Sequence, residues 1–115
     1  MVARQYIASI MPPAIGIDTI EQKGAVNADI IRAIEKNYPE AVRLSESIAN
    51  QFKGHSAKQT AYNIYKFLRE QITYLADPDH KQKIRLPNRF ISDATGDCKS
   101  FALFTASILA NLEMP

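Results

Sequence analysis

The segment from Asp97 to Leu112 constrains the fold more than any other part of the sequence, because apolar residues surround most of its circumference when it is drawn as a helix. The apolar positions are Phe101, Ala102, Leu103, Phe104, Ala106, Ile108, Leu109, Ala110 and Leu112. A soluble helix that is apolar nearly all round lies at the centre of its domain. The residues expected to be most buried are Phe101, Phe104, Ile108 and Leu112, packed against Ile64, Leu68 and Leu44.

Three further helices are predicted from apolar stripes at helical spacing. They cover residues 28–37, 39–53 and 57–73, beside the central helix at 97–112. Pro39 separates the first two, since proline fits a first turn but not a helix interior. Ser56 and Gln59 form a capping-box pattern at the start of the third. Residues 74–96 are expected to be loop with at most a short strand, so the predicted fold class is mainly α.

The 115 residues are enough for one domain. Residues 27–115 are predicted to form it, preceded by an N-terminal arm at 1–26. Prolines and glycines interrupt regular structure in the arm. Its isoleucines either attach it to the core or leave it a mobile terminus.

Composition excludes several classes of protein and site. A hydrophobic fraction of 46% is typical of a globular chain rather than a disordered one. One cysteine excludes an intramolecular disulfide, and His55 and His80 are too far apart for a metal motif, so we expect no metal and no cofactor. A net charge of +2 does not by itself indicate nucleic acid. No apolar run is long enough for a membrane span, and we expect a soluble, cytoplasmic protein with a reduced thiol.

Cys98 is the residue that stands out chemically, because it follows Gly96-Asp97 at the predicted start of the central helix. Unpaired amides at a helix N-terminus carry partial positive charge, which favours a thiolate over a thiol. Lys99 acts in the same direction and Asp97 in the opposite one. The same amides are placed to hydrogen-bond an oxyanion. We expect the sulfur to lie at or near the surface of a groove lined by residues 81–90. The alternative is that Cys98 is a small buried core residue.

A basic segment precedes this helix and contains no acid between His80 and Ser92. Its cations are Lys81, Lys83, Arg85 and Arg89. We interpret them as a solvated edge, with contact to a phosphate or an acidic partner as the alternative. His80 is interpreted as a loop residue, the alternative being a base that reaches Cys98. His55 is interpreted as a turn residue between helices.

The second half of the chain resembles the transglutaminase-like superfamily, which has a papain-like fold. Three stretches carry the resemblance: Ala61–Arg69, then Ile72-Thr73-Tyr74, then Gly96–Ala102 leading on to Leu109 and the terminal Met114-Pro115. More loosely, the chain is similar to transglutaminase-like proteins of Bacteroidetes and their phages. The resemblance implies the helical half of an α+β fold whose C-terminal sheet is missing here.

The resemblance implies that Cys98 is the catalytic nucleophile, which attacks an amide or acyl carbon and forms a thioester. The backbone amide of Cys98 would then be an oxyanion donor. The implied substrate is a peptide or protein amide, as for a cysteine-protease-like hydrolase or acyl transferase. The family places its His and Asp after the cysteine, whereas His55 and His80 precede Cys98, and Glu113 occupies the place of a glycine. We therefore expect a truncated domain that is inactive on its own.

Two partners follow from this interpretation: the missing sheet segment, and a second copy associating through an apolar edge that the sheet would cover. The alternative function is non-catalytic, a small helical adaptor or phage structural module with Cys98 as a core residue. Thiol reactivity distinguishes the two.

Overall fold

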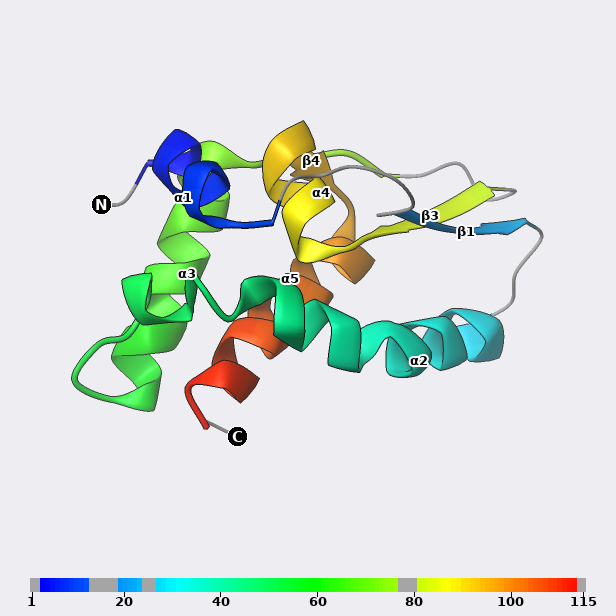
Figure 1. The fold of residues 1–115 in the computed structure, drawn as a ribbon. Helices are drawn as coiled ribbons and strands as arrows, with labels where there is room; N and C mark the ends of the chain where they lie inside the picture. The colour runs from blue at the N-terminus through cyan, green and yellow to red at the C-terminus, as the bar shows by residue number, and fades with distance from the viewer. Residues whose placement is uncertain (1–2, 13–18, 24–26, 77–80, 114–115) are drawn as a thin grey trace.

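A computed structural model describes residues 3–12, 19–23, 27–76 and 81–113 (Figure 1). The helices are α1 (Arg4–Ile10), α2 (Asn27–Ser45), α3 (Ala57–Gln71), α4 (Pro87–Asp93) and α5 (Cys98–Asn111), with a 3-10 turn η1 (Ala49–Gln51). The strands are β1 (Thr19–Lys23), β2 (Thr73–Tyr74), β3 (Lys81–Arg85) and β4 (Thr95–Gly96). The chain is mainly helical, as predicted. Among these described helices, none is both long and apolar enough to cross a membrane.

α5 lies between two hydrophobic clusters, which explains why it is apolar on nearly every face. Phe104 and Ile108 are fully buried in the first cluster, together with Phe52, Phe67 and Phe90. The second cluster lies on another side of α5. It contains Leu103, Ala33, Ala41, Leu44, Ile84 and Leu86. The prediction of a central last helix is confirmed.

The predicted core was right for two of its four α5 residues. Phe101 and Leu112 are only partly buried, at the margin of the first cluster. Ile64 and Leu68 belong to the cluster of Phe104, as expected. Leu44 packs with Leu103 in the second cluster instead.

α2 is one helix, although the sequence predicted a break at Pro39. Ala33, Ala41 and Leu44 fall on one continuous buried stripe, with Ile34 and Tyr38 packed against it. A break at Pro39 would divide that stripe, so burial against α5 and β3 offsets the interior proline, which costs about 3 kcal/mol. The helix ends at Ser45 and not at residue 53, because the chain turns into η1 to bury Ile48 and Phe52.

α3 confirms its prediction. The Ser56 hydroxyl accepts a hydrogen bond from the Gln59 amide at 3.1 Å, which caps the first turn. Ile64, Phe67 and Leu68 are buried against α5, and the opposite face is exposed. The helix ends at Gln71, two residues before the predicted end at residue 73, because Thr73 already belongs to β2.

The N-terminal segment contains structure that the sequence did not predict. In α1, Ile7 is fully buried in the first cluster, and Met11 follows it there. β1 pairs antiparallel with β3, placing Ile20 opposite Ile84. The described parts of the arm are therefore attached to the core. Pro13, Gly16 and Gly24, which are among the prolines and glycines expected to interrupt the arm, lie outside the described residues.

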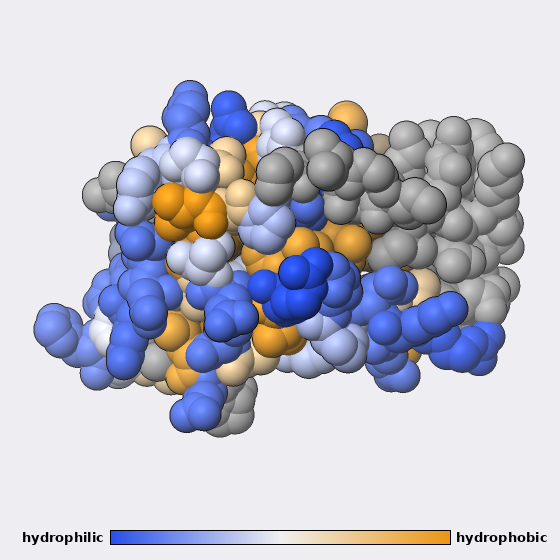
Figure 2. Space-filling view, viewed as in Figure 1, coloured by the Kyte–Doolittle hydropathy of each residue, from blue (hydrophilic) through white to orange (hydrophobic). Residues whose placement is uncertain are grey.

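The segment 74–96 is more structured than predicted. β3 confirms the short extended stretch, but α4 was not expected. Pro87 occupies the start of α4, where its missing amide is no loss, and Phe90 and Ile91 are fully buried. Asn88 is buried as well, and a helix of only seven residues that buries a proline and a polar side chain beside two apolar ones shows no recognisable apolar stripe in the sequence. Figure 2 shows hydrophobic residues surfacing mainly at the middle of one face, where α1, α2 and α4 meet.

Candidate nucleophile site at the start of α5

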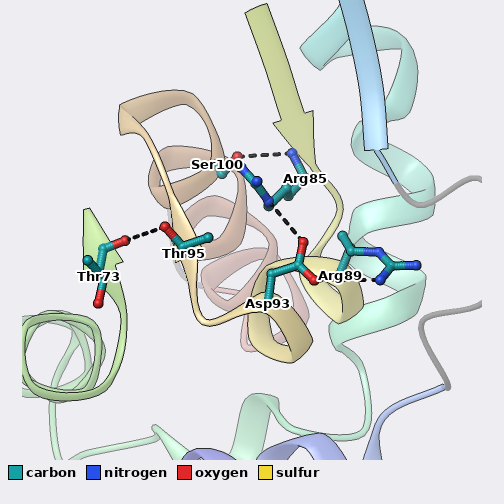
Figure 3. A network of polar contacts seen from close by, with 6 residues as sticks. All are labelled: Thr73, Arg85, Arg89, Asp93, Thr95 and Ser100. Carbon is teal, nitrogen blue, oxygen red and sulfur yellow. Dashed lines mark hydrogen bonds and ion pairs between the residues drawn. The ribbon is translucent and has the colours of Figure 1, made fainter. Parts of the chain in front are cut away.

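The chain reaches Cys98 through a short parallel pairing of β4 with β2. The Thr73 amide donates to the Ala94 carbonyl at 2.9 Å, and the Leu75 amide donates to the Gly96 carbonyl at 2.8 Å. The Thr95 hydroxyl adds a bond to the Thr73 carbonyl at 3.0 Å (Figure 3). The end of α3 and the start of α5 are thereby held side by side.

Gly96 is required by packing inside the protein. A Cβ atom there would lie 2.9 Å from Cε1 of the Phe90 ring and 3.0 Å from Cβ of Ser100. Gly96 is itself buried. Phe90 and Ser100 therefore pack directly against the Gly96 backbone, and these contacts fix the turn into α5.

Asp97 is the N-cap of α5. Its carboxylate accepts from the Lys99 amide at 3.1 Å and forms an ion pair with the Lys99 ammonium. Asp97 is 4% exposed, so the cap is nearly buried. The opposing influences of Asp97 and Lys99 on the thiol are therefore combined in one neutral pair. The amides of the first turn of α5 lie beside the thiol as well.

Cys98 is the first residue of α5 and is exposed. Its position at the helix start and its surface location agree with the sequence-based expectation. Because the side chain is exposed, packing in the core does not account for it. The arrangement leaves the sulfur accessible to an electrophile beside a helix N-terminus.

A polar network on the neighbouring turn of α5 was not predicted (Figure 3). The buried Ser100 hydroxyl accepts from the Arg85 amide at 2.9 Å, which holds the end of β3 against α5. The Arg85 guanidinium donates to Asp93 at 3.1 Å, and Arg89 approaches the same carboxylate at 3.5 Å. The spacing of Arg89 and Asp93, four apart on a helix, is the one signal that the sequence offered.

This network corrects the interpretation of the basic segment. Arg85 and Arg89 are paired with Asp93, which lies just beyond the acid-free stretch, so they are not free cations on a solvated loop. The side chains of Lys81 and Lys83 lie outside the described residues. The end of β3 does lie next to the start of α5, but a substrate groove lined by residues 81–90 stays a prediction.

The structure describes one of the two histidines, His55. His55 is exposed and directly precedes α3, whereas β2, at the other end of α3, leads to the Cys98 turn. The 15 residues of α3 rise about 22 Å, so His55 is far from the thiol. Its interpretation as a turn residue holds. His80, like Asp77 and Asp79, lies outside the described residues.

Among the residues that the structure describes, no three His, Cys, Asp or Glu side chains form a group that could hold a metal ion.

Comparison with known families gives one match. A family model described as "Transglutaminase-like domain" matches residues 43–115, from the end of α2 through α5. Searches of curated proteins and of solved structures find no match. The matched region includes the β2–β4 pairing and the whole Cys98 turn.

Proposed function

Because the chain belongs to the transglutaminase-like domain family through residues 43–115, we propose that it carries the nucleophile of a thiol-dependent domain acting on amide bonds. The observation that supports this most is the exposed Cys98 at the first position of α5, inside the matched region. A cysteine-protease-like chemistry follows from a free thiol at such a helix end.

In the proposed reaction, the Cys98 thiolate attacks the carbonyl carbon of a peptide or protein amide. A carbon–sulfur bond forms, and the carbonyl π electrons move to oxygen, giving an oxyanion next to the α5 amides. Collapse expels the amine, which takes up a proton, and leaves a thioester on Cys98. Water then completes hydrolysis, or a second amine completes acyl transfer.

The leaving amine needs a proton donor, and positioned acid–base groups typically contribute about 10²–10⁴-fold. Within the described ranges, the one histidine is His55, at the far end of α3. We therefore expect the 115-residue chain to lack turnover on amides by itself. The partner that we propose for completing the site is a sheet segment that supplies a His. We also place the protein in the cytoplasm, where the thiol stays reduced.

Alkylation tests the nucleophile directly, because the chain has a single cysteine and every labelled thiol is Cys98. We expect iodoacetamide at neutral pH to modify the folded chain faster than the same chain in denaturant. Cys98→Ser is the control and takes up no label. Slower labelling of the folded chain would contradict the assignment and favour the non-catalytic adaptor or structural module.

A further inference from the structure

One segment of the molecule, made of η1 and most of α3, contains basic residues and no acidic ones. From Ser47 to Arg69 the chain carries four Lys or Arg residues and no Asp or Glu, although the whole sequence has 14 basic and 12 acidic residues. The segment forms η1, the following turn and most of α3.

Two hollows flank Tyr62 on the first half of α3. One has a volume of about 400 Å³ and is lined by Gln59, Tyr62, Asn63 and Lys66, with Phe52 and Phe67 among its other walls. The second measures about 340 Å³ and is lined by Ser56, Lys58, Gln59 and Tyr62. Each hollow has one lysine, and neither is lined by an acid. Tyr62, shared by both, is 54% exposed.

The walls between these hollows are held by hydrogen bonds. Asn63 donates to the Phe52 carbonyl at 3.0 Å and accepts from the Gln59 side chain at 2.9 Å. The turn before α3 is fixed by a 2.8 Å bond from the Gly54 amide to the Thr60 hydroxyl. A surface arranged in advance loses less entropy when a partner binds.

The spacing of the two lysines sets the shape of a matching ligand. Lys58 and Lys66 are eight positions apart on α3, with Tyr62 between them, so they are separated by about 12 Å along the helix axis. An extended peptide advances about 3.3 Å per residue. Two carboxylates four residues apart, which point to the same side of an extended chain, therefore match the two lysines.

We propose that this face of α3 is a docking site for an extended acidic peptide segment of a partner protein, with two acidic residues four positions apart. Its carboxylates pair with Lys58 and Lys66, and its backbone crosses Gln59 and Tyr62. The side-chain amides of Gln59 and Asn63 offer hydrogen-bond donors and acceptors to the peptide groups of such a segment. The site does not depend on Cys98, which lies at the other end of α3.

The probe is a short fluorescein-labelled peptide of Gly and Ser with two Glu separated by three residues, titrated with the full chain at low ionic strength. We expect Lys58→Ala and Lys66→Ala each to weaken binding about two- to fivefold, as exposed ion pairs do, and the double variant about tenfold. Lys36→Ala, which removes an exposed cation on α2, is the matched control and should change the Kd less than about twofold.

Three results would overturn the proposal. The first is equal affinity for a peptide in which Gln replaces both Glu residues. The second is an effect of Lys36→Ala on the Kd as large as that of Lys66→Ala. The third is tighter binding of single-stranded oligothymidylate than of the peptide. Binding by Cys98→Ala separates this site from the proposed chemistry. Unchanged affinity is expected, and a loss would show that the peptide occupies the Cys98 site instead.

Discussion

At the scale of single residues, three consecutive side chains define the surroundings of the thiol. Asp97 caps α5 and holds the Lys99 ammonium, so these two charges offset each other beside Cys98. The amides at the start of α5 carry partial positive charge, which stabilises a thiolate at this position. A cap that is nearly buried also fixes where the first residue of the helix points.

Asp97→Ala removes the cap and leaves Lys99, whose side chain is 11% exposed, without its carboxylate. N-cap deletions cost about 0.5–2 kcal/mol, and the loss of the ion pair between Asp97 and Lys99 adds to this. We expect the free energy of unfolding in urea to fall by about 1–3 kcal/mol. Asp97→Asn keeps an acceptor for the Lys99 amide and should lose less. An equal loss for both variants would show that the cap hydrogen bond contributes nothing.

Contacts between residues within one helical turn could be predicted from the sequence, whereas contacts between separate elements could not. The Ser56 cap and the position of Cys98 depend on neighbours within one turn, so their sequence patterns were sufficient. The pairing of Arg85 with Asp93 and Ser100 depends on how three elements meet in space. No local pattern contains that information. The catalytic role of Cys98 stays a prediction.

At the scale of elements, α4 fixes the turn that carries the thiol. Its Phe90 ring packs on Gly96, and the αL conformation of Ala94, with φ of 57°, directs the chain from α4 into β4. Phe90 also contacts Phe101 edge-on, with ring centroids 5.2 Å apart. The short helix is therefore the support on which the Cys98 turn rests.

Gly96→Ala places a methyl group 2.9 Å from the Phe90 ring. Overpacking of this kind costs about 1–3 kcal/mol, and we expect that loss of stability in thermal or urea unfolding. In a Phe90→Leu background the same change should cost less, because the ring is gone; a double-mutant cycle measures the difference. Additive losses would mean that Phe90 is not what excludes a side chain at residue 96.

The elements that the sequence predicted are those with long stripes and caps, α3 and α5. α1 and α4, each with seven residues, are too short for an apolar stripe to repeat along the helix. The break expected at Pro39 was wrong because tertiary packing along one face of α2 outweighs the cost of the proline.

At the scale of the whole molecule, α5 joins two clusters that would otherwise be separate. In the first, Phe104 stands 6.0 Å from Phe52, 6.3 Å from Phe67 and 5.3 Å from Phe90, measured between ring centroids. These rings come from η1, α3, α4 and their flanks, so one side chain of α5 holds most of the fold together. Its loss should affect the protein globally.

Phe104→Ala should lower the free energy of unfolding by about 3–5 kcal/mol, as deletion of a buried aromatic ring does. Urea denaturation followed by circular dichroism measures it. Phe101→Ala is the comparison, since this ring lies on the same helix but is only partly buried, and it should cost clearly less. A loss below about 1 kcal/mol for Phe104→Ala would show that α5 is not central.

Acylation of the full chain by p-nitrophenyl acetate tests most directly whether Cys98 is a nucleophile, because the leaving group of this ester departs without a proton donor. We expect a burst of p-nitrophenolate equal to one equivalent of protein and an acetyl thioester on Cys98 in the mass spectrum. Cys98→Ser should give no burst, and a peptide amide should not be turned over. If the folded chain shows no burst, Cys98 is not a nucleophile and the central claim fails. If it turns over the amide through Cys98, the chain contains its own base, and His80 is the first residue to replace.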